Sequence, residues 1–111
     1  MASYGFVTPV KPGKLEAWKG YIGELKGARK KDLEASRKKI GLSKEEVWLQ
    51  KTPMGDFAVV HFECSDPGKV LQHFMTSKEP FDVWFREKIL VEVHGLDPKG
   101  PPPALNEKIF G

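Results

Sequence analysis

The segment that most constrains the fold is residues 45–63, EEVWLQKTPMGDFAVVHFE, whose pattern predicts two strands joined by a tight turn. The first strand is expected over residues 46–50 and the second over residues 57–63, where β-branched and aromatic residues dominate. The second strand is apolar at almost every position, and His61 is the exception near its middle. A strand that is apolar on both sides needs cover on both sides.

The register of this hairpin decides which side chains share a face, because a slip of one residue turns a strand over. We expect Lys51 to pair with Asp56, leaving a loop from Thr52 to Gly55 with Pro53 in a type I turn. One face then carries Val47, Leu49, Ala58, Val60 and Phe62, and the other carries Glu46, Trp48, Gln50, Phe57, Val59, His61 and Glu63. The alternative, a three-residue loop with Gly55 in a bulge, would mix these sets.

The chain before the hairpin predicts a strand and a long helical region. Residues 4–10 are typical of a strand, and Pro9 indicates an edge or strand-end position. A helical pattern begins at Lys14 and ends at Gly41, either as one helix or as two joined by a kink at Gly27. Its apolar stripe consists of Leu15, Trp18, Ile22, Leu25, Leu33 and Ile40.

The chain after the hairpin predicts two helices and a last strand. Asp66-Pro67 and Glu79-Pro80 are typical helix starts, and His94-Gly95 is expected to close the second helix. Residues 95–104 form a proline-rich connector, and residues 105–110 are expected to form the last strand. The predicted order β-α-β-β-α-β is the ferredoxin-like arrangement of an α+β domain with an antiparallel sheet.

Composition bounds the class of protein. The length of 111 residues predicts a single domain, residues 1–111, and no apolar run is long enough to span a membrane. The start of the chain lacks the pattern of a secretory signal, and a lone cysteine forms no internal disulfide, which favours the cytoplasm. A net charge of +3, from 18 basic and 15 acidic residues, argues against nucleic acid as a partner.

The second face of the hairpin predicts a homodimer. Trp48, Phe57 and Val59 lie on this face, and burying such side chains stabilises a protein by about 1.5–3 kcal/mol each. Because the helices cover the first face, a second copy of the chain is the simplest cover for the other. Two such sheets packed face to face would close a dimeric α/β barrel with the helices outside.

The order of residues in three runs, 48–50 (WLQ), 55–60 (GDFAVV) and 80–86 (PFDVWFR), resembles a family of short bacterial proteins designated a domain of unknown function. The similarity covers roughly residues 10–95. That family belongs to the ferredoxin-like, dimeric α/β-barrel superfamily, so the resemblance implies a fold and a dimer but no activity. The superfamily includes cofactor-free monooxygenases, haem-degrading enzymes, lactone isomerases and ligand-sensing domains, and a shared fold does not choose among them.

His61 and Glu46 are the candidate catalytic residues. The expected register places them opposite each other, and a carboxylate beside an imidazole fixes its tautomer and raises its pKa, as a general base requires. The alternative is a structural pair that keeps a buried histidine satisfied. The other histidines, His73 and His94, lie near expected helix ends, where surface roles are typical. The histidines lack the spacing of metal ligands, so no metal site is predicted.

Arg29 is the candidate group for holding a negative charge on a ligand, since it falls on the apolar stripe of the predicted helix. The alternative is that Gly27 breaks the helix and Arg29 reaches solvent. The remaining candidate ligand-binding residues are aromatic or polar: Tyr21, Trp48, Gln50, Phe57 and Trp84. Asp82 and Arg86 are expected to form an exposed pair one helical turn apart.

These observations favour a homodimer that binds a small aromatic or anionic molecule without a tightly bound cofactor, and they leave open whether it catalyses a reaction. A non-catalytic dimerisation or ligand-sensing subunit is the main alternative. An RNA-recognition module has the same order of elements, but Asp56 stands where its third strand requires glycine, and Val59 replaces a stacking aromatic residue.

Overall fold

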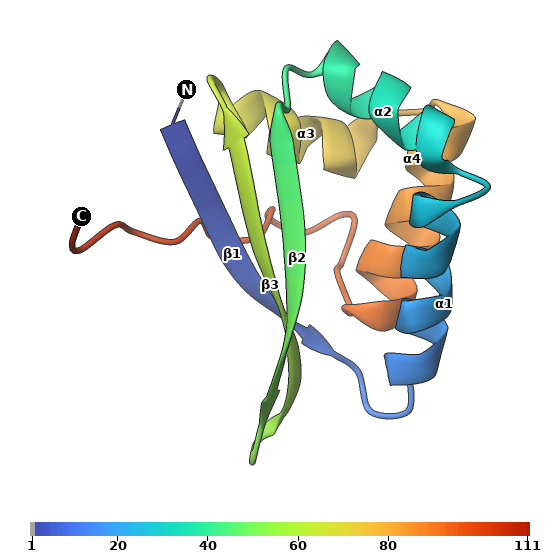
Figure 1. The fold of residues 1–111 in the computed structure, drawn as a ribbon, viewed down its shortest axis with the longest axis vertical. Helices are drawn as coiled ribbons and strands as arrows, with labels where there is room; N and C mark the ends of the chain where they lie inside the picture. The colour runs from blue at the N-terminus through green and yellow to red at the C-terminus, as the bar shows by residue number, and fades with distance from the viewer. Residues whose placement is uncertain (1) are drawn as a thin grey trace.

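The computed structural model describes residues 2–111 as an α+β fold, with helices against one face of an antiparallel sheet (Figure 1). The elements in chain order are β1 (Ala2–Val10), α1 (Leu15–Lys26), α2 (Lys30–Lys39), β2 (Lys44–Thr52), β3 (Gly55–Cys64), α3 (Pro67–Thr76), α4 (Pro80–Trp84) and the π-helix η1 (Phe85–Val93). The predicted α+β class with an antiparallel sheet is therefore confirmed.

The sheet has three strands in the order β1-β3-β2, so the hairpin strand β3 is central and β1 is an edge. Lys51 pairs with Asp56, as predicted. Thr52 and Gly55 pair as well, which shortens the loop to Pro53 and Met54. The Thr52 hydroxyl supports this tighter loop, since it donates to the Gly55 carbonyl (2.8 Å) and accepts from the Met54 amide (3.1 Å).

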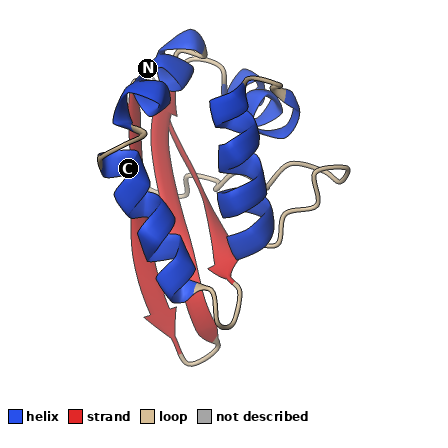
Figure 2. Ribbon diagram, turned by 90° about the vertical axis from the view of Figure 1, so that its right-hand side faces the viewer, coloured by secondary structure: helices blue, strands red, loops and turns tan. Residues whose placement is uncertain are grey.

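The two faces of the sheet differ in cover, because all the helices lie on one side (Figure 2). Toward the helices, Ala58 and Phe62 are 0% and 1% exposed and form the centre of the core. On the opposite face, Trp48 is 62% exposed and Val7 53% exposed. The apolar residues of β3 that face this way, Phe57 and Val59, are half-buried. Within residues 2–111 no helix covers this open sheet face.

The helix boundaries follow local signals in the sequence. Of the two alternatives for this region, one long helix or two joined by a kink at Gly27, the second is formed, since Gly27 ends α1 and α2 begins at Lys30. Asp66 caps α3 by accepting a hydrogen bond from the Lys69 amide (3.1 Å), as the motif predicted. Gly95 has a φ of +71° after the last helix, a left-handed conformation that glycine adopts without a steric penalty.

The π-helix η1 changes which residues face the core. In an α-helix, nine residues make about two and a half turns, so His94 would lie opposite Phe85. The hydrogen bonds of a π-helix join residues five apart, which widens each turn and brings positions nine residues apart back to nearly the same side. Phe85, Ile89, Leu90, Val93 and His94 are all buried. His94 therefore lies in the core, and its expected surface role was wrong.

The predicted last strand, residues 105–110, is not formed. Residues 101–111 have no regular structure, and the chain ends on the side of the sheet away from the helices (Figure 1). A hydrogen bond from the Asn106 amide to the Gly5 carbonyl (2.6 Å) attaches this tail to the edge of β1. The three prolines at 101–103 lack amide donors, so the connector enters the tail without strand hydrogen bonds of its own.

Candidate functional site

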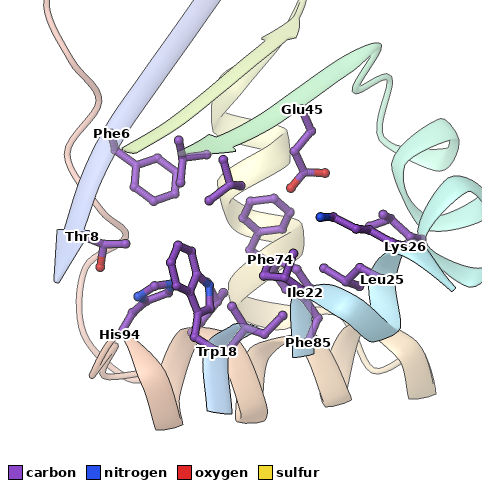
Figure 3. A pocket seen from close by; sticks show the side chains of 15 residues that line it. Phe6, Thr8, Trp18, Ile22, Leu25, Lys26, Glu45, Phe74, Phe85 and His94 are labelled. Carbon is purple, nitrogen blue, oxygen red and sulfur yellow. The ribbon is translucent and has the colours of Figure 1, made fainter. Parts of the chain in front are cut away.

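A cavity of about 230 Å³ lies between the covered face of the sheet and helices α1 and η1 (Figure 3). Its walls come from all three strands and from α1, α2, α3 and η1. The walls are mostly aromatic and aliphatic. The few polar groups in the lining belong to Thr8, Lys26, Glu45, Trp18 and His94. This combination of an apolar cavity and a few polar groups is typical of a site for a small molecule.

Helix α1 contributes one wall because its apolar residues recur at helical spacing. Trp18, Ile22 and Leu25 project from the side of α1 that faces the sheet (Figure 3). Opposite them, Phe6 and Thr8 alternate along β1 and point toward the helices. The pocket therefore depends on the same apolar alternation that builds the core.

The indole of Trp18 carries an unsatisfied donor. Trp18 is 5% exposed, and its Nε1 has no hydrogen-bond partner among residues 2–111. An indole N–H can only donate, and a buried donor without a partner costs about 1–3 kcal/mol.

His94 lies beside Trp18 with a defined tautomer. The two rings meet edge to face, with centroids 5.8 Å apart. The Nδ1 of His94 lies 2.8 Å from the Pro9 carbonyl, which can only accept, so Nδ1 carries the proton. Burial lowers the pKa of His94 and outweighs the opposite effect of this hydrogen bond. The neutral ring then keeps Nε2 as a hydrogen-bond acceptor.

We expect the buried neutral His94 to make stability depend on pH. Unfolded His94 has an ordinary pKa of about 6.5, so it binds a proton more readily than the folded residue does. The stabilisation is therefore complete above pH 6.5 and is lost as the pH falls toward the lower folded pKa. Urea denaturation at pH 7.5, 6.5 and 5.5 should show this decline. His94→Asn, whose amide can still donate to Pro9, should flatten it, and an equal decline in both proteins would contradict the assignment.

Charged side chains gather at the other end of the pocket. Figure 3 shows Lys26 and Glu45 at this end, across the cavity from His94 and Trp18. Arg37 holds Glu45 through a two-pronged ion pair, with N–O distances of 2.8 and 3.3 Å. The guanidinium also stacks on the rings of Phe74 and Phe85, which are themselves pocket walls. This end of the pocket is therefore rigidly built and polar.

A buried polar cluster lies behind this end. Asp82 is 5% exposed and accepts hydrogen bonds from Ser36 (2.6 Å) and Ser77 (2.7 Å). His73 Nε2 lies 2.9 Å from the same carboxylate, although without hydrogen-bond alignment. Burial alone would raise the pKa of Asp82, but these hydrogen bonds and the electrostatic effect of the neighbouring His73 and Arg37 side chains hold it below its usual value. The cluster ties α2, α3 and α4 together.

The expected surface pair of Asp82 with Arg86 was therefore wrong. Asp82 points into the helix layer, and Arg86 donates instead to the carbonyls of Phe74 (3.0 Å) and Ser77 (2.8 Å). Both side chains fasten α3 to the helix that follows it. Spacing along one helix could not reveal this arrangement, because the partners come from other elements.

The candidate catalytic residues lie on the open sheet face, away from the cavity. Glu46 and His61 are cross-strand neighbours, as predicted, with 3.6 Å between Oε1 and Nδ1. Their side chains are 44% and 37% exposed, and exposed pairs of this kind contribute at most about 1 kcal/mol. By the register, Trp48, Gln50 and Phe57 share this face.

The other candidate ligand-binding residues form a separate cluster on the helices. Arg29 pairs with Glu24 (3.0 Å) and lies over the ring of Trp84, 3.9 Å from its centroid. Tyr21 meets Trp84 edge to face and donates to Glu92 (2.6 Å). This hydrogen bond raises the pKa of Tyr21, with burial adding to the effect. Arg29, Trp84 and Tyr21 thus come together, but not with His61 and Glu46.

The pocket includes residues that the sequence analysis did not select, chiefly His94, Thr8, Lys26 and Glu45. The sequence carries no signal for His94, because apolar residues at 85, 89 and 93 repeat at the four-residue spacing of an ordinary α-helix. Thr8, Lys26 and Glu45 carry no signal either, because they meet only in the folded chain.

Comparison with known proteins gave no assignment: no family model matches the chain, and no curated protein matches it. In the part of the chain that the structure describes, no cluster of three or more histidine, cysteine or acidic residues could hold a metal ion. Across the same residues, no helix has the length and apolar character needed to cross a membrane.

Proposed function

We propose that this protein binds a compact, mainly apolar molecule in the pocket between its sheet and helices α1 and η1. The observation that carries this proposal is the cavity itself, about 230 Å³ in volume and walled mostly by aromatic and aliphatic side chains with a few polar groups among them. A cavity of about 150 Å³ is enough to hold benzene, so this one accommodates one ring or two fused rings. Lys26, at the end of the pocket that also holds Glu45, would pair with an anionic group if the ligand carries one.

The test uses fluorobenzene as a probe, observed by ¹⁹F NMR. We expect binding to the wild-type protein with a dissociation constant on the order of 1 mM or tighter, about −4 kcal/mol. Ile22→Phe should abolish it, because the larger side chain fills the cavity that Ile22 lines. Ile109→Phe is the matched control, since Ile109 is 85% exposed in the tail. No binding to the wild type, or equal binding to Ile22→Phe, would overturn the proposal.

We also propose that two copies pair through the open sheet face as a dimeric α/β barrel of ferredoxin-like subunits. The exposed Trp48 and Val7 support this pairing, because together with Phe57 and Val59 they make an apolar patch across all three strands. The attachment of Asn106 to the free edge of β1 supports the ferredoxin-like order, since a last strand would have to pair at that edge.

A further inference from the structure

We infer that the ligand of this pocket is an aromatic carboxylate, whose ring lies in the cavity and whose carboxylate pairs with Lys26. This inference rests on the proposed function, and it specifies the chemical class of the ligand. It depends on a cationic side chain without an ion-pair partner at the place where the apolar cavity meets solvent.

The cavity reaches solvent between α1 and the edge strand β2. A second hollow of about 240 Å³ adjoins it there, and the two share four lining residues: Trp18, Ile22, Lys26 and Val47. Val47 pairs with Val60 on the side of the sheet that faces the helices, yet it is 41% exposed. A ligand can therefore enter beside Val47, and we call this opening the mouth of the pocket.

Two lysines of α1 lie at the mouth. Lys26 lines both hollows, and Lys19 lines the outer one. Seven residues make nearly two full turns of an α-helix, so the two lysines project from the same side of α1. Figure 3 shows the ammonium end of Lys26 directed toward the cavity. Among residues 2–111, neither lysine takes part in an ion pair.

Glu45, the carboxylate nearest to Lys26 in Figure 3, is already paired. Arg37 binds both of its oxygens, at 2.8 and 3.3 Å. The positive charge of Lys26 is therefore available to a ligand, and an anionic group is complementary to it. Glu45 also limits the charge that the site accepts, because a second negative charge on the ligand would be repelled by its carboxylate. A carboxylate, with a single charge, fits this balance better than a phosphate.

The walls of the cavity favour an aromatic ring as the rest of the ligand. Phe6, Phe74 and Phe85 supply ring faces and edges around the cavity (Figure 3). Rings in edge-to-face or offset contact attract one another beyond the burial of their area. An aromatic carboxylate therefore satisfies both parts of the pocket, whereas a neutral molecule of the same shape leaves Lys26 unpaired.

The test compares 4-fluorophenylacetate with its neutral amide, 4-fluorophenylacetamide, by ¹⁹F NMR at pH 8. We expect the carboxylate to bind at least about fivefold more tightly, because only the carboxylate forms an ion pair with Lys26. Raising the salt concentration from about 20 to about 500 mM should weaken binding of the carboxylate and leave binding of the amide unchanged. (4-Fluorobenzyl)phosphonate, which carries a second negative charge, should bind no more tightly than the carboxylate.

Three variants and a control locate the two parts of the ligand. Lys26→Gln should reduce the preference for the carboxylate to within about twofold, and Lys26→Arg should keep it. Ile22→Phe should abolish binding of both probes, because the larger side chain fills the cavity. Lys31→Gln is the matched control, since it removes the same charge at an exposed position outside the lining of the pocket and should keep the preference.

The outcomes separate this inference from the proposed function. Equal binding of the carboxylate and the amide, or a preference that survives in Lys26→Gln, would overturn the inference and leave the pocket standing. Tighter binding of the phosphonate would overturn the assignment of a carboxylate. Binding of the carboxylate that persists in Ile22→Phe would place it on the surface, outside the cavity, and would also overturn the inference. If neither these probes nor fluorobenzene binds, the proposed function fails and the inference fails with it.

Discussion

Asp82→Ala should lower the free energy of unfolding by about 3 kcal/mol, because it removes the acceptor at the centre of a buried polar cluster. The hydroxyls of Ser36 and Ser77 lose hydrogen bonds to a charged group, and each such bond contributes about 1.5–3 kcal/mol. His73 loses the carboxylate that lies 2.9 Å from its Nε2. Urea denaturation followed by tryptophan fluorescence at pH 7 measures the change.

The matched control for this prediction is Asp32→Ala, the same substitution at an exposed position in the first turn of α2. There the carboxylate interacts only with the helix dipole, so the loss should stay below about 1 kcal/mol. If Asp82→Ala costs no more than Asp32→Ala, the cluster does not hold α2, α3 and α4 together, and its close distances carry little energy.

The hairpin was predictable because its pattern is local and strict. Alternation leaves Ala58, Val60 and Phe62 on one face, so a slip of one residue would expose them to water. The same holds for the Asp66 cap and for the break at Gly27, each of which depends on residues next to one another in sequence. The elements that such local patterns predict are present in the folded chain, because the tertiary packing agrees with the local preference.

The pocket was not predictable in the same way. The sequence pattern predicts a site at His61 on the open sheet face, because a histidine within an apolar strand stands out in a sequence. His94 gave no such contrast at the end of a helix, and only the π-helix brings it to the core. The unpaired state of Trp18 Nε1 is a property of the folded chain, because it depends on which atoms of β1, α1 and η1 meet. A sequence pattern can place Trp18 in the core, but it cannot show that its donor is unsatisfied.

The tail shows that a local strand pattern does not by itself produce a strand. Residues 105–110 carry strand-forming residues, yet only Asn106 makes a backbone hydrogen bond to β1 among the described residues. Ile109 and Phe110 remain 85% and 96% exposed. The tail meets the free edge of β1 only at Asn106, and the proline run before it sets the direction from which the chain arrives.

Trp48→Glu should dissociate the proposed homodimer, with a dissociation constant at least about 100-fold higher than that of the wild type. In a two-fold symmetric interface, each substitution acts twice, and a buried tryptophan at an interface centre contributes about 2–4 kcal/mol. The substitution should leave the subunit folded, because Trp48 is 62% exposed in the single chain. Sedimentation velocity across a dilution series measures the change.

The control for this experiment is Met54→Glu, which places the same charge at a 90% exposed apolar position in the hairpin loop. Met54 lies at the tip of the hairpin, beyond the strands that would meet, so this variant should associate as the wild type does. The contrast between the variants would locate the interface on the open sheet face rather than anywhere on the hairpin. A wild-type protein that sediments as a single subunit at micromolar concentration would contradict the dimer, because Trp48 and Val7 would then be stable in water without a partner.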